Sequence, residues 1–297
     1  MIGLLCRRLL ALVLVLAATA GGARAQAPAA IWSGTSAGFD VQWTTGDIVV
    51  RRGQQPVFSA RDWAQAGLAH FIDVNRDTRS ARPPDCTLTR SLRIVALVGT
   101  MMSLEDGFET TCRREAHPGG MTRLLTVNLA KPGSLAQAGR DAIGRVDPDQ
   151  PGRAVLLTDL FPASDVLAGL AGAPPLRDVL RRAKSTPATL PALLEAVAYA
   201  SGEGDACYSV PADLLAAFAF ARLDGERIVM RLGLPGDGPC RMNLTTADMP
   251  FALPESLTPA VRKAAAGQEG FLADRAETIA AGRRTVIELQ SGRGAGR

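Results

Sequence analysis

The stretch of sequence that decides the fold lies between Cys86 and Phe161. It reads CTLTRSLRIVALVGTMMSLEDGFETTCRREAHPGGMTRLLTVNLA over residues 86–130 and, after a polar insertion over residues 131–153, continues as AVLLTDLF. Its segment from Leu92 to Val98 is almost continuously apolar and rich in β-branched residues. This pattern is typical of a strand that is covered on both faces and lies centrally in its sheet.

Two more strands are expected after this one. Residues 101–112 form an extended pattern, within which the pair Asp106-Gly107 predicts a turn or bulge. Pro118 and the two glycines that follow it predict a tight connection. The alternating side chains from Leu124 to Leu129 then predict the next strand.

On the N-terminal side, residues 31–58 predict a set of strands, because apolar and polar side chains alternate from Phe39 to Thr44. Ser59 marks the start of a helix over residues 60–69. Residues 75–85 are charged and contain proline, which favours a loop.

On the C-terminal side, three successive helices, a hairpin around Asp224-Gly225 and a last helix are expected. These helices are expected at residues 166–171, at 176–183, after Thr189, and at 258–266. Between the hairpin and the last helix, residues 240–253 are expected to be irregular.

Together these elements predict an α+β fold. We expect a mostly antiparallel sheet with a layer of helices on one face and a small strand-rich N-terminal unit. The expected organisation is a signal peptide (1–25), the small β-rich unit (26–84), a main α+β domain (85–272), and a C-terminal tail (273–297) with a disordered end.

The first 25 residues have the features of a secretory signal peptide. Arg7 and Arg8 precede an apolar run from Leu9 to Ala20, and an A-x-A-type site predicts cleavage after Ala25. Twelve apolar residues are too few to span a membrane, which takes about 20. We therefore expect a periplasmic or secreted protein with no membrane span in its mature form.

Charge argues against nucleic acid as a partner. The chain has 33 Lys and Arg against 29 Asp and Glu, and cleavage of the signal peptide removes Arg7, Arg8 and Arg24. The mature protein is thus close to neutral, whereas phosphate binding requires a concentrated basic surface.

Four cysteines follow the predicted cleavage site, and an even number in an exported chain favours disulfides. We predict the pairs Cys86–Cys112 and Cys207–Cys240, because each pair brackets strands expected to be adjacent in one sheet. Three pairings are possible, and free buried thiols are the alternative. The chain has no C-x-x-C motif, which makes a zinc or redox role the least favoured.

Three short motifs follow one another in the chain: Glu115-Ala116-His117-Pro118-Gly119, Val127-Asn128-Leu129 and Leu156-Leu157-Thr158-Asp159-Leu160-Phe161. By these motifs, roughly residues 90–255 resemble the RsiV-type extracytoplasmic domain of unknown function. This domain occurs in the ectodomains of lysozyme-sensing anti-sigma factors and beside some peptidoglycan deacetylase domains. The resemblance implies an extracytoplasmic α+β domain that binds protein in some relatives. Anti-sigma members carry a cytosolic segment and a membrane helix before this domain. The present sequence shows neither, so we expect a free exported protein.

The acids and the histidine around this motif are the only candidates for chemistry. Glu115, His117 and Asp159 belong to the motif with no role that the sequence defines, and Glu105, Asp106 and Glu109 lie nearby. Two carboxyl groups across a cleft could cleave a glycan. The simpler interpretation places Glu105 and Asp106 at a solvated turn, His117 within its own turn, and Asp159 at a helix cap.

No metal or cofactor site is predicted. His70 and His117 lie far apart with no ligand spacing, and no nucleophile elbow, zincin, P-loop or dinucleotide motif occurs. We therefore expect an exported, non-catalytic envelope protein that binds a protein, with a lysozyme-like partner among the candidates, or peptidoglycan. The alternative is a cell-wall-acting hydrolase or an enzyme associated with deacetylation.

Overall fold

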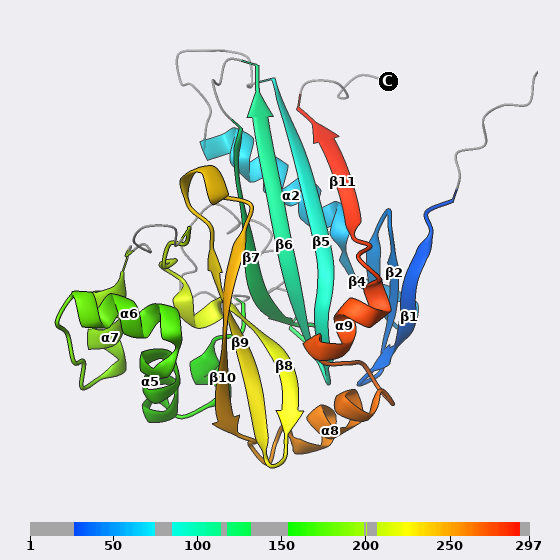
Figure 1. Cartoon of the computed structure of the whole chain (residues 1–297). Helices are drawn as coiled ribbons and strands as arrows, with labels where there is room; N and C mark the ends of the chain where they lie inside the picture. Colours follow the sequence, from blue (N-terminus) through cyan, green and yellow to red (C-terminus); the bar gives the residue numbers. More distant parts are fainter. Residues whose placement is uncertain are drawn as a thin grey trace, which may run out of the picture.

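The computed structural model describes residues 27–74, 85–113, 118–131, 154–198, 200 and 207–291. It confirms an α+β fold with antiparallel sheets. The central sheet has the order β11-β5-β6-β7 (Figure 1). Its strands are β5 (Cys86–Val98), β6 (Met101–Cys112), β7 (Gly119–Asn128) and β11 (Thr285–Gln290).

The N-terminal unit is a four-stranded meander followed by one helix. Its strands are β1 (Ala30–Ser36), β2 (Phe39–Thr44), β3 (Ile48–Arg52) and β4 (Gln55–Ser59), and its helix is α2 (Ala60–Val74). The Ser59 hydroxyl accepts a hydrogen bond from the Asp62 amide at 3.2 Å, as the predicted start of the helix requires. The apolar side chains of β2 are buried against one face of the central sheet.

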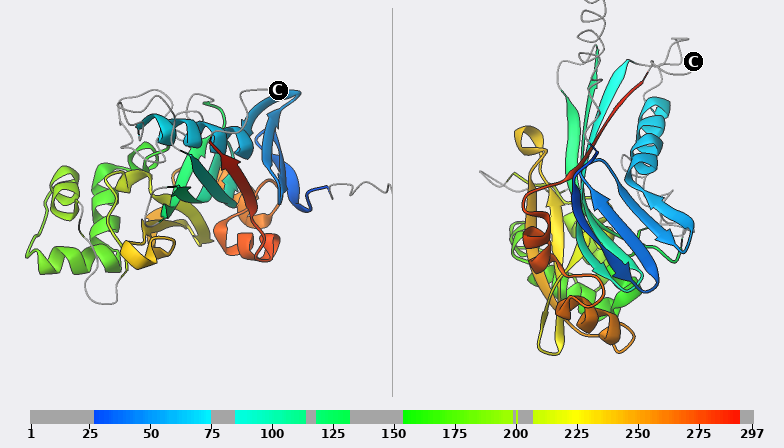
Figure 2. Two further views of the ribbon diagram at one scale, coloured as in Figure 1. Left: turned by 90° about the horizontal axis from the view of Figure 1, so that it is seen from above. Right: turned by 90° about the vertical axis from the view of Figure 1, so that its right-hand side faces the viewer.

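A second, three-stranded sheet covers part of the opposite face. It consists of β8 (Phe218–Asp224), β9 (Arg227–Pro235) and β10 (Leu244–Ala252), in the order β10-β9-β8. In the right-hand view of Figure 2 the central sheet lies between α2 with the N-terminal strands on one side and β8–β10 on the other. The prediction of a strand buried on both faces is confirmed, because residues 94–98 of β5 are all buried.

A layer of helices packs against the three-stranded sheet. Their buried side chains share one core with β8, β9 and β10, and Figure 1 shows them together on one flank. These helices are α4 (Leu157–Leu160), α5 (Ala163–Gly172), α6 (Pro174–Arg182) and α7 (Leu190–Val197). Two further helices, α8 (Thr258–Ala266) and α9 (Ala273–Ala280), lie apart from them and contact β5 and β8. Short 3-10 turns occur at Leu214–Ala216 and Gly238–Cys240.

Three sequence predictions about elements are wrong. Most of the stretch 240–253 is not irregular, because Leu244–Ala252 form β10, which pairs with β9 along its whole length. The helix over 258–266 is not the last, and residues 273–290 are not a tail. They form α9 and then β11, which pairs with β5 from Thr285 to Gln290. The predicted loop at 75–84, the insertion at 132–153, the signal peptide and the final residues lie outside the described residues.

Both disulfides form with the predicted pairing. Cys86 and Cys112 are cross-strand partners at the ends of β5 and β6, with Cα atoms 4.1 Å apart. Cys207 and Cys240 are also joined. Both lie outside the strands, and they bracket β8 and β9, which are neighbours in one sheet, as predicted. Ser291 helps to hold this end of the sheet beside the Cys86–Cys112 disulfide, since its hydroxyl accepts a hydrogen bond from the Cys86 amide at 2.7 Å.

The C-terminal strand should contribute to stability through its buried face. Ile287 is 3% exposed in the core, whereas its neighbour Val286 is 53% exposed. We expect Ile287→Ala to lower the free energy of unfolding by about 2–4 kcal/mol through the lost burial and the cavity. The matched Val286→Ala should change it by less than about 0.5 kcal/mol. Chemical denaturation of both variants measures this, and equal small effects would mean that β11 is dispensable.

Candidate functional site

Of Glu115, His117 and Asp159, the three motif residues singled out in the sequence, only Asp159 lies in the described part of the chain. Asp159 caps a helix, as the simpler interpretation expects, because its Oδ2 accepts the Leu156 amide at 2.8 Å at the start of α4. Glu115 and His117 lie outside the described residues. His70, half-buried near the end of α2, belongs to no potential metal cluster. No group of three or more His, Cys, Asp or Glu side chains suited to a metal occurs among the described residues.

Asp106 is completely buried, so its placement at a solvated turn is wrong. Strand β6 continues straight through Asp106 and Gly107, both of which pair with β5 and β7. The Asp106 carboxylate forms a bidentate pair with Arg90, at 2.8 Å from Nε and 2.6 Å from Nη2. Arg123 approaches the same carboxylate at 3.3 Å. A charge buried in this way must be paired.

Arg90 is held from the helix side as well. Its guanidinium lies 5.1 Å from the ring centroid of Trp63 in α2 and donates a hydrogen bond to the Trp63 carbonyl at 3.2 Å. The pair therefore joins the central sheet to the N-terminal unit. Burial by itself would raise the pKa of Asp106, but the charges and hydrogen bonds of Arg90 and Arg123 outweigh it and hold that pKa below its ordinary value.

We expect Asp106→Asn to destabilise the fold by about 3–5 kcal/mol, because it leaves the Arg90 charge buried without its counter-ion. The double variant Arg90→Met, Asp106→Leu removes both charges and should recover most of the loss. Urea denaturation of the two variants measures the difference. If the double variant is as unstable as the single one, the ion pair itself, and not the unpaired charge, supplies the stability.

The same pair predicts how stability depends on pH. Because the pKa of Asp106 is lower in the folded protein than in the unfolded chain, its contribution is fully present above the unfolded value, about pH 4. It is lost as the pH falls through the folded value. The difference in the free energy of unfolding between the wild type and the double variant should therefore shrink below about pH 4. Denaturation curves between neutral and acid pH measure it; a difference that stays constant would contradict this assignment.

Glu105 lies on the opposite face of the sheet and is also fully engaged. Its two carboxylate oxygens contact Arg93 Nη2 and Arg284 Nη1, each at 2.5 Å. Arg93 additionally pairs with Glu277 of α9. Two arginines, Arg93 and Arg284, thus pair with two glutamates, Glu105 and Glu277, in one charge-balanced network.

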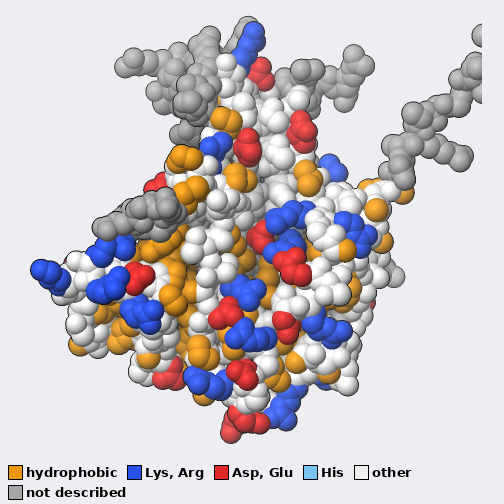
Figure 3. Space-filling view, viewed as in Figure 1, with side chains coloured by type: hydrophobic (Ala, Val, Ile, Leu, Met, Phe, Trp, Pro, Cys, Tyr) orange, Lys and Arg blue, Asp and Glu red, His pale blue; other side chains and the backbone are white. Residues whose placement is uncertain are grey.

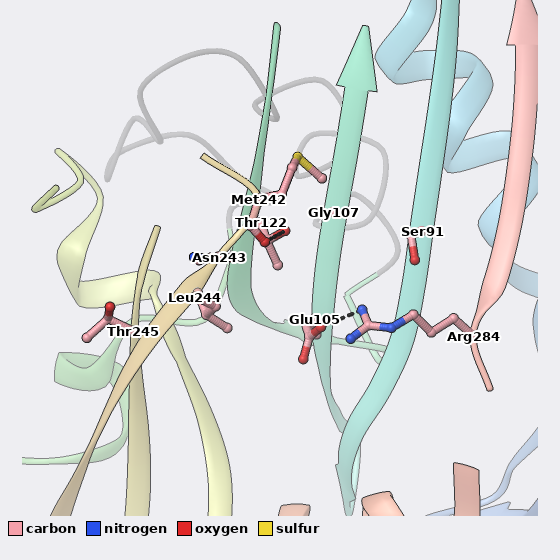
Figure 4. A pocket seen from close by; sticks show the side chains of 9 residues that line it. All are labelled: Ser91, Glu105, Gly107, Thr122, Met242, Asn243, Leu244, Thr245 and Arg284. Atoms are coloured by element: carbon pink, nitrogen blue, oxygen red, sulfur yellow. Dashed lines mark hydrogen bonds and ion pairs between the residues drawn. The ribbon is translucent and has the colours of Figure 1, made fainter. Parts of the chain in front are cut away.

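A groove of about 650 Å³ opens beside this network. Figure 4 shows it between β5 and β6 on one side and the start of β10 on the other, with Arg284 reaching across β5 to Glu105. The lining residues are Ser91, Glu105, Gly107, Thr122, Met242, Asn243, Leu244, Thr245 and Arg284.

The groove exists because small residues coincide on three neighbouring strands. Ser91 lies opposite Gly107, and Gly107 lies opposite Thr122, so all three share one face of the sheet. Met242 forms the rim, where its carbonyl accepts a hydrogen bond from the Thr122 hydroxyl at 2.9 Å. A Cβ at Gly120 would lie only 2.5 Å from the Phe108 carbonyl and 3.2 Å from Met242 Sδ. Glycine is therefore required at this position.

The sheet face above the groove is open and carries acidic side chains. Glu109 and Glu288 both lie opposite Thr89, one on each neighbouring strand. No described residue forms an ion pair or side-chain hydrogen bond with either glutamate. Figure 3 shows this upper half of the face as mostly uncharged, with a few isolated side chains of either charge, above a gathering of charges of both signs. The open face, defined as Thr89, Ser91, Gly107, Glu109, Thr122 and Glu288, is thus net negative.

Sequence reasoning identified Glu105, Asp106 and Glu109 but missed Ser91, Thr122 and Met242. One signal was available. The predicted disulfide aligns β5 with β6, since Ser91 follows Cys86 by as many positions as Gly107 precedes Cys112. No comparable signal placed β7 or Met242.

Comparisons with known proteins give no relative. No family model, no curated protein and no solved structure matches the chain. In the part of the chain that the structure describes, no helix is long and apolar enough to cross a membrane.

Proposed function

We propose that the protein is an exported, non-catalytic envelope protein that binds a basic protein partner on the open face of its central sheet. The observation that carries the proposal is this face itself. A hollow of small side chains lies next to two glutamates that have no counter-charge among the described residues. Such a surface attracts a positively charged partner and offers it a recess for a protruding side chain.

The side chains around the groove favour binding over catalysis. Hydrolysis of a glycan requires one carboxyl group with a raised pKa and a second one nearby. Glu105 instead contacts two guanidinium groups, and Asp106 is buried behind the sheet with a lowered pKa. Neither is suited to donate a proton to a leaving group.

A protein fits the groove better than a glycan does. The nine residues that line it include no aromatic side chain on which a sugar ring could stack. Among the described residues the exposed large apolar side chains are Met242 at the rim and Val286 opposite Ser91. Hydroxyl groups, a few apolar contacts and a surrounding charge are typical of a modest protein interface. A lysozyme-like protein, which the resemblance suggested, belongs to this basic class.

Export is supported by the cysteines and the N-terminal sequence. Two disulfides are formed, and disulfides persist mainly in oxidising compartments such as the periplasm or the exterior. The signal-peptide pattern of residues 1–25 agrees with this location.

The test is titration of a basic lysozyme against the mature protein by calorimetry. Ser91→Trp fills the groove and should weaken binding by about tenfold or more, since a blocked recess at the centre of an interface costs at least one hot-spot contact. Glu109→Gln with Glu288→Gln should weaken it by about three- to tenfold, and more at low salt. The matched control is Glu255→Gln, which removes an exposed acid elsewhere.

Two outcomes would contradict the proposal. One is binding that neither the groove variant nor the double glutamate variant weakens, because the open face would then not be the interface. The other is release of soluble products from isolated cell walls, detected by chromatography. Such release would establish the enzymatic alternative.

A further inference from the structure

A second recess lies at the free edge of the N-terminal sheet. Strand β1 pairs only with β2 in this sheet. The two strands are joined by the two-residue turn Ala37-Gly38, in which both residues have positive φ, at 47° and 79°. In such a hairpin the flanking residues, Ser36 and Phe39, exchange hydrogen bonds, and every second residue beyond them does the same.

The amide and carbonyl groups of Ser33 and Thr35 therefore point away from β2. The other side of β2 agrees, since the Thr44 amide donates to Asp47 of the β2–β3 connection, which leaves Phe39, Val41 and Trp43 to pair with β1. No described residue forms a hydrogen bond with the outward groups of Ser33 or Thr35. Two donors and two acceptors are thus available at this edge.

Both ends of β1 are held by hydrogen bonds to other parts of the protein. Near one end of β1 the Ala30 carbonyl accepts a hydrogen bond from Arg283 at 2.8 Å. At the other end the Ser36 hydroxyl donates to the Gly99 carbonyl at 2.8 Å. Edge strands usually have some protection against pairing with other chains. Here the part of the edge that is free to pair is confined to Ser33–Thr35, between these two hydrogen bonds.

This open part faces a slot of about 380 Å³, near the lower end of the size range of ligand pockets. Its far wall is the connection from α8 to α9, which is anchored because Phe271 and Leu97 exchange backbone hydrogen bonds at 2.8 and 3.0 Å. The Trp32 ring packs edge-on against Phe271, with centroids 5.1 Å apart. The lining residues are Trp32, Ser33, Gly34, Thr35, Gly267, Gln268, Gly270, Phe271, Arg275 and Ile279.

Arg275 supplies the only charge among these lining residues. The Arg275 guanidinium lies against Gly267. A Cβ at position 267 would be 1.9 Å from Nη1, so only glycine leaves space for the guanidinium there. Gly267 also has a φ of 67° at the end of α8. No described residue provides a counter-ion for Arg275. An uncompensated guanidinium beside unpaired backbone groups favours a ligand that combines a carboxylate with an extended backbone.

We propose that this slot binds the C-terminal end of an extended polypeptide. The peptide adds a short strand to β1 through Ser33 and Thr35, and its terminal carboxylate pairs with Arg275. The positive charge selects a carboxyl end over an amino end. A free chain end can place its carboxylate on Arg275, which the β1 edge of a second copy cannot do, so the slot favours a free chain end. This inference does not depend on the function proposed for the open face.

The experiment uses fluorescein-labelled pentapeptides of random sequence with free C-terminal carboxylates, and the same library with amidated ends. Fluorescence anisotropy should show that the mature protein prefers the free-acid library by about tenfold or more, because a charge-assisted pair is lost on amidation. Arg275→Gln should remove this preference. Arg262→Gln, an exposed arginine of α8 that does not line the slot, is the matched control and should leave it intact.

Backbone pairing is tested separately. Thr35→Pro removes an outward amide without touching the ladder to β2, and proline is tolerated at such edge positions. Thr35→Pro should weaken the binding of the free-acid peptides by about fivefold, which corresponds to the loss of roughly one hydrogen bond. Thr35→Val keeps the amide, so its affinity for the same peptides should stay within about twofold of the wild-type value. Thermal unfolding confirms that each variant is folded.

Equal binding of acid and amide libraries would overturn the proposal. So would a wild-type protein that sediments as a dimer and becomes monomeric in Thr35→Pro, because the edge would then pair with a second copy. Either failure is distinguishable from failure of the proposed function, since Ser91 and Glu109 take no part in this slot.

Discussion

The structure depends on one constraint, which is that β5 and β6 are covered differently on their two faces. One face of each strand packs against the N-terminal unit, and part of the other face packs against β8–β10. Since side chains alternate between the faces, neighbouring residues face quite different surroundings. Asp106 is sealed beneath α2 with Arg90, whereas Glu105, one residue earlier, reaches the groove and Arg284.

This alternation explains why two adjacent acids have different roles. The Asp106 pair lies where water is excluded and must be complete, because an unpaired charge there would be costly. The Glu105 network runs from the buried Glu105 out to the half-exposed Arg284 and the exposed Glu277, and exposed ion pairs contribute less to stability. It closes the lower end of the groove without leaving a free acid. The open face above it keeps its negative charge because no described residue forms an ion pair with Glu109 or Glu288.

The sequence was sufficient for elements with strong local signals. The alternation in β2, the apolar run in β5, the Asp-Gly turn between β8 and β9, and the proline-marked starts of α7 and α8 all correspond to observed elements. The sequence led to wrong predictions where a local turn or loop signal was overridden by pairing with residues far away in the chain. Asp106-Gly107 has the composition of a turn, but Arg90 and the flanking strands hold it extended. Pro250 weakens the strand pattern of β10, which forms because β9 pairs with it.

The candidate sites were less predictable than the fold, for a geometric reason. The open-face groove depends on the register of three strands, which places Ser91, Gly107 and Thr122 side by side. The β1 slot depends on a contact between residues near position 33 and residues near position 270. Neither coincidence leaves a periodic pattern in the chain. Only the Cys86–Cys112 pair carried register information, and only for two of the strands.

The position of β11 has a consequence for how the chain acquires its structure. Cys86 and Ser291 touch across a sequence separation of 205 residues, and β5 has no partner on that side until β11 arrives. Contacts of such long range slow folding, and an unpaired strand edge exposed in the meantime invites aggregation. During synthesis the central sheet can therefore close only late. For an exported protein, as we propose this one to be, such late closure keeps the nascent chain competent for translocation, and the Cys86–Cys112 bond can then join β5 to β6 in an oxidising environment.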